Sequence, residues 1–369
     1  MCKVGEKSES VTADRDGSRG HILTPEDTMS KRVTNAEGTV FCGIDVSAKS
    51  LSVAVQREDH AAEQRTFANN ASGHKLLLSW PQKWRARVRV SLEATGVYSL
   101  DLSIALNAAE GIELAVLNPK AANRFAQTIR RSKTDAADAD VLAEYSRRMP
   151  FTAWRAPNQN ALRLRSISRY MGSLTTQNAV GMNRLHAAEG SKSTHRCVIQ
   201  DLKRSLISTE LRVRKLRHEA MRLIREDEEL HLRYRLLISI PGIAQISAIH
   251  LLGELCTLPE DMTVREWVAH SGLDPAHEIS GTSVKKQSRI SRAGNRHLRS
   301  ALYMPALVGS RCDPRMKGFY EMLIARHKTR LQALVAVARK ILHAVYGVLH
   351  SSTPYDGGKL FPLIVLDKD

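Results

Sequence analysis

The chain has 369 residues, enough to bury a core in two or three domains, and its 55 Lys and Arg against 38 Asp and Glu give a formal net charge of +17. Charge of that size favours a polyanionic partner, nucleic acid first, whereas 5% aromatic residues argue against a platform that stacks single-stranded bases. The five scattered cysteines form no C-x-x-C pair, which argues against zinc or a disulfide framework and fits a reducing cytoplasm.

Residues 1–37 are polar and show no apolar period, so we expect a disordered tail, within which Met29 is an alternative first residue. No signal peptide is visible.

The next segment, 38–150, has the pattern of a mixed sheet flanked by helices. Residues 39–58 predict two strands around a short turn, and the stretches "RVRVSLE" and "IELAVLNP" predict two more, each followed by helical sequence. In such sheets, sites form at the carboxyl ends of the strands, where Asp45 and Glu93 fall. Taken singly, Asp45 fits an ordinary turn residue and Glu93 an exposed strand end.

The stretch "SKTDAADADVLAEY" that follows carries four carboxylates on one predicted helix. Helical spacing puts Asp135 and Asp138 on one face, bordered by apolar residues, and Asp140 well away from Asp135. Two carboxylates about 4 Å apart repel by roughly 4 kcal/mol at an effective dielectric of 20, and a divalent cation removes that repulsion. These residues alone favour a solvated helix face, but together with Asp45 and Glu93 they favour a metal site.

Segment 151–235 changes character. Between residues 155 and 235 there are 17 Lys and Arg against 8 Asp and Glu, and apolar residues recur at roughly heptad intervals. We expect a long helical arm or coiled coil that serves dimerisation, with a basic surface that suits a nucleic-acid backbone.

Segment 236–350 predicts a mainly helical domain, followed by a tail at 351–369. Within it, "LLISIPGIAQISAIHLLG" is apolar, but Pro241 and Gly242 interrupt it, so we predict buried helices around a tight turn and no membrane span. That turn is equally compatible with a phosphate contact and with a plain helical hairpin. Residues 282–300 contain no acid and six basic side chains, which predict a DNA or RNA contact: Lys285, Lys286, Arg289, Arg292, Arg296 and Arg299.

Six motifs, in this order along the chain, resemble those of the DEDD-type insertion-sequence transposases, relatives of the Piv DNA invertases. They are "GIDVSAKSLSVAV", "SLEATGVYS", "SKTDAADADVLAEYSRR", "IPGIAQISA", "SGLDPAHEISG" and "ISRAGNRHLRSALYMPAL". The resemblance covers residues 40–350. It implies an α/β plus all-α fold, in which the N-terminal domain is RNase H-like (RuvC-like). One departure is visible, because Ala244 stands where the family's turn usually has a second glycine.

The resemblance also implies a chemistry. The acidic tetrad maps onto Asp45, Glu93, Asp135 and Asp138 and would hold Mg²⁺, two ions in the usual arrangement, or Mn²⁺. Ser280, directly before Gly281, would be the nucleophile, although Ser283 lies nearby and spacing alone gives Ser280 no special role.

The same resemblance implies the partners of the protein. They are double-stranded donor and target DNA, a bridge RNA whose base pairing chooses the sequence, and copies of the chain, dimers that assemble into a tetramer. The expected location is the bacterial cytoplasm, associated with the nucleoid.

Three other functions fit the same residues. A metal-dependent nuclease or junction resolvase would use water in place of Ser280, and a site-specific DNA invertase would share the chemistry. In a non-catalytic nucleic-acid-binding protein the four carboxylates would be structural.

Overall fold

The computed structural model describes residues 38–57, 60–84, 86–94, 96, 98–129, 135–276, 279–280, 284–285, 289–291 and 293–361. The tail expected at residues 1–37 lies outside the described residues. The chain divides into two compact units, Met1–Trp154 and Arg155–Asp369.

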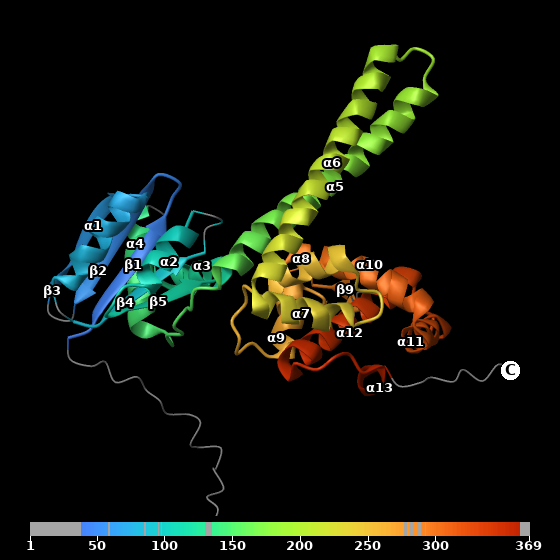
Figure 1. Cartoon of the computed structure of the whole chain (residues 1–369). Helices are drawn as coiled ribbons and strands as arrows, with labels where there is room; N and C mark the ends of the chain where they lie inside the picture. The colour runs from blue at the N-terminus through green and yellow to red at the C-terminus, as the bar shows by residue number, and fades with distance from the viewer. Residues whose placement is uncertain are drawn as a thin grey trace, which may run out of the picture. The chain divides into compact units, whose positions relative to one another are not determined.

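The first unit is built on a five-stranded mixed sheet in the order β3-β2-β1-β4-β5 (Figure 1). The strands are β1 (Val40–Val46), β2 (Ser50–Arg57), β3 (His60–Ala68), β4 (Val88–Glu93) and β5 (Ile112–Leu117). β2 pairs antiparallel with β1 and β3, whereas β4 lies parallel to both β1 and β5. This is the RNase H-like arrangement, and the predicted fold class is confirmed.

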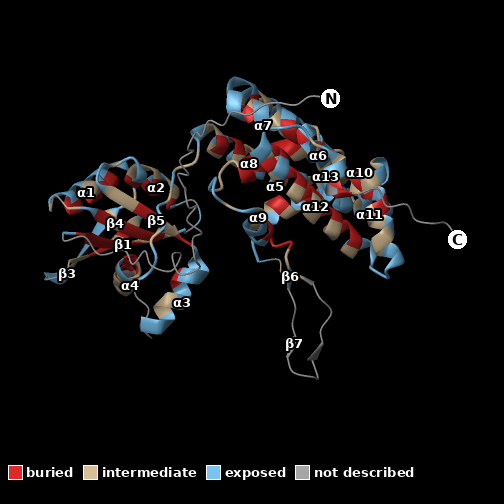
Figure 2. Ribbon diagram, turned by 90° about the horizontal axis from the view of Figure 1, so that it is seen from below, coloured by how far each residue is buried: buried red, intermediate tan, exposed pale blue. Residues whose placement is uncertain are grey.

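Helices cover both faces of this sheet, as Figure 2 shows. Two of them, α1 (Ala71–Gln82) and α2 (Leu100–Asn107), lie against one face, and α4 (Asp135–Arg148) packs against β1, β2 and β4 on the other, next to α3 (Pro119–Ile129). The larger core lies under α1 and α2, where Leu77 and Leu102 meet alternate residues of β1, β2 and β4.

The second unit is mainly helical. Its first two helices, α5 (Gln159–Gly190) and α6 (Arg196–Glu226), form a long antiparallel hairpin (Figure 1). The remaining helices are α7 (Glu228–Ile238), α8 (Gln245–Leu255), α9 (Val264–Ser271), α10 (Arg296–Cys312), α11 (Pro314–Ala325), α12 (Arg330–Ser351) and α13 (Gly357–Leu360).

One core holds this unit together. The base of the hairpin, α7, α8, α10 and α12 contribute buried side chains to it, among them Leu164, Ile224, Leu252 and Ile341. In the part of the chain that the structure describes, α12 alone is long and apolar enough to cross a membrane, and half of its most apolar window is buried inside the protein. The apolar run around Pro241 forms α7, a turn and α8, as predicted.

Between α9 and α10 the described residues form the two-residue strands β6 (Pro275–Ala276), β7 (Ile279–Ser280), β8 (Val284–Lys285) and β9 (Arg289–Ile290). β6 pairs with β9 and β7 with β8, both antiparallel, so this segment is a hairpin, hereafter the Ser280 hairpin.

Candidate functional site

Asp45 and Glu93 end neighbouring strands and belong to the same face of the sheet. Residues 40, 42, 44 and 46 of β1 join the core under α1 and α2, so Gly43 and Asp45 belong to the α4 face. On β4, Ser91 hydrogen-bonds to Ser146 of α4, and Glu93 follows it by two residues. The parallel register pairs Gly43 with Ser91 and Ile44 with Leu92, which brings Asp45 level with Glu93.

α4 crosses this face at very short range because Gly43 has no side chain. A Cβ added to Gly43 would overlap the carbonyl oxygen of Ala139 and the amide nitrogen of Ala143. Both alanines are fully buried and pack on Ala54 of β2. Small residues on both elements therefore fix the distance between α4 and the strand that carries Asp45.

The direction of α4 brings Asp138 to the edge where Asp45 and Glu93 lie. Near the end of α4, Ser146 Oγ lies 2.7 Å from Ser91 Oγ and donates to the Arg89 carbonyl, both earlier in β4 than Glu93. The start of α4 is therefore directed toward the carboxyl ends of the strands. Leu142, one turn after Asp138, packs with Leu117, the residue that pairs with Glu93.

Three of the four predicted carboxylates, those of Asp45, Glu93 and Asp138, are therefore directed to one edge, and all three residues are half-buried. Asp135 is the first residue of α4, and its side chain lies outside the described residues. Among the side chains that the structure describes, no group of three or more His, Cys, Asp and Glu lies close enough together to hold a metal ion.

The donor set fits Mg²⁺ chemically. Asp and Glu offer only oxygen ligands, the kind that this hard cation prefers, and half-buried carboxylates keep access to the water that it retains. Asp45, Glu93, Asp135 and Asp138 are the residues that would hold the metal.

The other two acids of α4 have protein partners. Gln64 of β3 donates to Asp140 Oδ2 at 2.7 Å, and Gln56 of β2 donates to the Asp140 carbonyl. Glu144 forms ion pairs with Arg147 and Arg148. The Glu144 ion pairs lie within α4, whereas the two glutamine contacts tie α4 to the antiparallel half of the sheet. Asp140 therefore differs in role from Asp138, two residues away.

Ser280 is the last residue of β7, where it pairs with Val284 of β8. Its side chain, and those of Lys285 and Arg289, lie outside the described residues, as do Lys286 and Arg292 altogether. Arg296, at the start of α10, is exposed, whereas Arg299 is half-buried and donates to the Ser271 carbonyl oxygen at 2.8 Å.

A buried ionic network that the sequence did not reveal joins α5, α8 and the residue that precedes α10. Glu254 of α8 is only 2% exposed and accepts two hydrogen bonds from the Arg169 guanidinium of α5, at 2.7 and 2.8 Å. Asn295, which precedes α10, donates to the same carboxylate at 2.6 Å. The one clue in the sequence is a single acid in the otherwise apolar "ISAIHLLGEL".

The network keeps Glu254 ionised. Burial alone would raise the pKa of this carboxyl group, but the hydrogen bonds from Arg169 and Asn295 outweigh burial and hold the pKa below its usual range. The same pairing raises the pKa of Arg169. Nearby, burial lowers the pKa of His250, His270 and His297, which favours their neutral forms.

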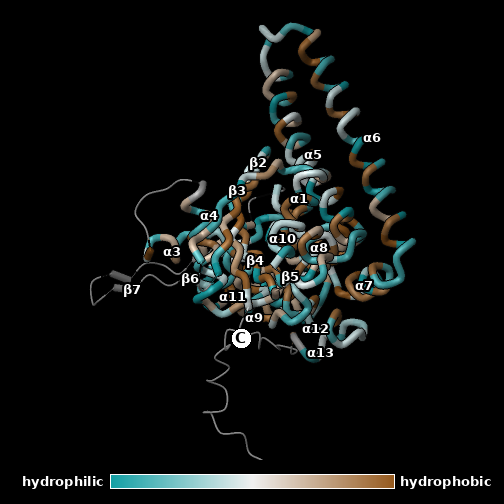
Figure 3. Tube along the Cα trace, turned by 90° about the vertical axis from the view of Figure 1, so that its left-hand side faces the viewer, coloured by the Kyte–Doolittle hydropathy of each residue, from teal (hydrophilic) through white to brown (hydrophobic). Residues whose placement is uncertain are grey.

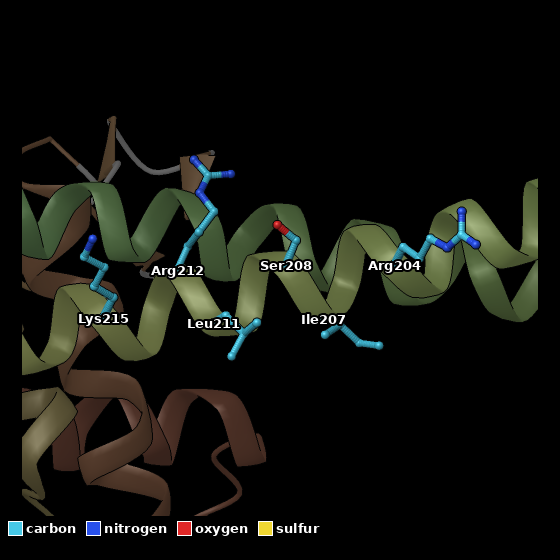
Figure 4. A pocket seen from close by; sticks show the side chains of 6 residues that line it. All are labelled: Arg204, Ile207, Ser208, Leu211, Arg212 and Lys215. Carbon is cyan, nitrogen blue, oxygen red and sulfur yellow. The ribbon is translucent and has the colours of Figure 1, made fainter.

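The outer face of α6 carries an apolar stripe bounded by basic residues. Ile207 and Leu211 are 61% and 55% exposed and point the same way (Figure 4). Arg204, Arg212 and Lys215 flank them and, with Ser208, line a shallow pocket. Arg212 also hydrogen-bonds to Tyr170 of α5. The basic side chains along this arm suit a phosphate backbone as well as a protein partner.

An RNase H-like sheet with acids at its strand ends defines a class of proteins that act on nucleic acids. Two family models match the chain: a DEDD transposase model over residues 42–188, and a model described as the transposase IS116/IS110/IS902 family over residues 234–321. The chain belongs to the IS110 family of DEDD-type transposases.

Curated relatives agree with this assignment. The "Pilin gene-inverting protein" of Moraxella bovis is 28% identical over 321 residues, which cover 86% of this chain and 97% of the relative, and that of Moraxella lacunata matches to the same extent. The "Insertion element IS110 uncharacterized 43.6 kDa protein" of Streptomyces coelicolor is 31% identical over 131 residues, 35% of this chain and 31% of the relative. The family acts on DNA, which it cuts and rejoins.

Proposed function

We propose that this transposase cuts DNA with Ser280 as the nucleophile, at a site whose metal ligands are Asp45, Glu93, Asp135 and Asp138. The observation that supports it best is the common edge to which Asp45, Glu93 and Asp138 are directed. The close packing of Gly43 against α4 supports a site with little freedom to rearrange. Mg²⁺ bound there would neutralise the charge that builds up on the phosphate in the transition state.

The covalent step conserves the energy of the phosphodiester. The Ser280 hydroxyl oxygen bonds to phosphorus, the bond from phosphorus to a deoxyribose oxygen breaks, and the serine proton leaves to solvent while the released deoxyribose oxygen gains one. The product is a phosphodiester between protein and DNA, so a hydroxyl group from another strand can reverse the step and reseal the DNA without ATP.

The basic side chains of this chain would hold the nucleic acids. Arg296 and the exposed cations of α6 offer phosphate contacts without base specificity, which fits a choice of sequence by a paired bridge RNA. Ser280 and the four carboxylates belong to different units of the chain, so we propose that the protein works as an oligomer on DNA, with the α5–α6 hairpin assisting assembly.

A variant series tests the proposed site. Supercoiled DNA that carries the element's ends is incubated with the full chain, Mg²⁺ and the transcript of the flanking region. Asp45→Asn and Asp138→Asn each remove a metal ligand, a loss of several kcal/mol of transition-state stabilisation, so recombinant product should fall by about 100-fold or more. Asp140→Asn is the matched control on α4 and should keep its activity because Asp140 bonds to Gln64.

Ser280→Ala separates the serine mechanism from hydrolysis. We expect no covalent protein–DNA adduct and no joined product from this variant. Cleavage that persists in Ser280→Ala and leaves hydrolysed ends would instead identify a nuclease or resolvase that uses water. Full activity of both Asp45→Asn and Asp138→Asn would contradict the metal site.

Site-specific inversion is the second candidate, because the relatives that match this chain over nearly their whole length are named for gene inversion. Its chemistry is the same, and the substrate decides between the two. A plasmid with two inverted sites is incubated together with an unrelated plasmid. An invertase should only reorient the segment between the sites, whereas a transposase should insert DNA into the unrelated plasmid.

A further inference from the structure

A buried carboxylate such as Glu254 of α8 costs free energy of desolvation, and a contribution to stability does not explain its presence well. A charge buried to 2% exposure loses its hydration, and a buried ion pair often stabilises a fold no more than apolar residues of the same size. What such a pair supplies is a fixed position. The two parallel bonds from Arg169 orient the carboxylate, and Oε2 accepts a further bond from Asn295.

Asn295 stands at the exit of the Ser280 hairpin. Its side-chain oxygen caps α10 by accepting from the amides of His297 and Leu298, at 2.9 and 3.2 Å. The backbone N–H of Asn295 donates to the His270 carbonyl oxygen at 2.7 Å, at the end of α9 where the hairpin begins. One residue therefore joins the exit of the hairpin to its entrance and to Glu254.

Further bonds hold the entrance and the exit together. Ser291 donates from its amide to the Asp274 carbonyl oxygen at 2.9 Å and from its hydroxyl to Asp274 Oδ1 at 2.6 Å. Gly294 passes so close to His270 that a Cβ there would overlap the His270 carbonyl oxygen. The base of the hairpin is thus a rigid unit attached to α5 and α8 through Glu254.

We propose that Glu254 is a positioning residue for the Ser280 hairpin: through Asn295 and Arg169 it fixes the direction in which the hairpin leaves the helical core. The inference rests on the proposed role of Ser280. A nucleophile on a short two-stranded segment reaches a phosphate productively only if the base of that segment is held, because small displacements cost large factors in rate.

Asn295→Ser is the cleanest test, since serine still caps α10 but cannot reach the Glu254 carboxylate as asparagine does. Glu254→Gln is the second variant, of the same shape without the charge. We expect both to form the covalent protein–DNA adduct about 10- to 100-fold more slowly than the unaltered protein, with DNA affinity changed by less than about twofold. Ile341→Val, a core truncation on α12, serves as the control that lowers stability without touching the network.

Hydrogen exchange supplies a readout that does not depend on chemistry. The amides of Ser291 and Asn295 should exchange faster in Asn295→Ser and Glu254→Gln, and at the unaltered rate in Ile341→Val. If Glu254 has only a structural role, its variants should form the adduct no more slowly than Ile341→Val of equal stability. That result would overturn the inference.

The outcomes also separate this inference from the proposed function. If Ser280→Ala abolishes the adduct while Asn295→Ser and Glu254→Gln form it at the unaltered rate with unchanged exchange, the positioning role fails and the serine mechanism stands. If Ser280→Ala still forms the adduct, the proposed nucleophile fails, and only the exchange result bears on Glu254.

Discussion

At the residue scale, Gly43 sets how closely α4 approaches the sheet. Alanine at this position would push its Cβ into the backbone of Ala139 and Ala143, and backbone cannot move as a side chain can. We expect Gly43→Ala to lower the free energy of unfolding by about 1–3 kcal/mol, as overpacking does, and to impair catalysis further by displacing Asp138.

Thermal unfolding of Gly43→Ala measures this, with Gly347→Ala as the control. Gly347 is an exposed residue inside α12 with nothing within 4 Å of an added Cβ. Alanine there should stabilise the helix by up to about 1 kcal/mol. Equal stability of the Gly43→Ala variant and the unaltered protein would contradict the close packing of α4 on β1.

Two half-buried histidines predict a dependence of stability on pH. Burial lowers the pKa of His250 and His270 from the ordinary value of 6.5, so the unfolded chain binds more protons than the folded protein below that pH. Their contribution to stability is complete above pH 6.5 and is lost as the pH falls through the folded pKa. We expect a lower melting temperature at pH 5.5 than at pH 7.5, and a flatter dependence in His250→Gln/His270→Gln.

Single residues show where sequence reasoning reaches and where it stops. Asp45 and Glu93 could be predicted to share an edge because strand ends follow from apolar runs. The partner of Asp140 could not be predicted, because Gln64 lies on β3, an exposed edge strand whose polar sequence has no alternation. Glu254 and Arg169 are 85 positions apart, and no local pattern joins them.

At the element scale, the α5–α6 hairpin takes its stability from its base. The buried residues of α5 end at Leu174, and those of α6 begin at Ala220, whereas Figure 3 shows hydrophilic and apolar positions interspersed along the outer part. Gly181 lies opposite Leu206, which gives the register in which the hairpin can be shortened.

A variant with a shortened α5–α6 hairpin therefore tests whether the outer part of the hairpin contributes to assembly and not to the stability of the core. Replacing residues 182–205 with a short glycine-rich turn should shift the melting temperature by no more than about 4 °C, because no core side chain is lost. If the arm assists assembly, sedimentation on DNA should show smaller complexes and strand joining should fall. Loss of cooperative unfolding would contradict an arm that is independent of the core.

The elements themselves were largely predictable. Enrichment in Val, Ile and Phe or alternation predicted β1 and β2, and the stretches "RVRVSLE" and "IELAVLNP" predicted β4 and β5. The imperfect heptad pattern predicted long helices where α5 and α6 lie. The two-residue strands of the Ser280 hairpin were not predicted, because segments this short have no period to detect.

At the scale of the whole molecule, the proposed site needs four carboxylates of the first unit and one hydroxyl of the second. We propose that this division of the site makes cutting await assembly on DNA, so that a single copy away from DNA is inactive. A mixture of Asp138→Asn and Ser280→Ala chains tests this arrangement. Adduct formation recovers if the two units act across protomers, and it does not recover if they act within one chain.

The most direct measurement is the identity of the amino acid that becomes linked to DNA. The full chain is incubated with DNA, Mg²⁺ and the flanking transcript, digested with nuclease and trypsin, and its nucleotide-bearing peptide is sequenced by mass spectrometry. We expect a nucleotide on the peptide Glu266–Lys285, at Ser280 and not at Ser283. Cleaved DNA with no linked peptide, or a nucleotide on any other residue, would contradict it.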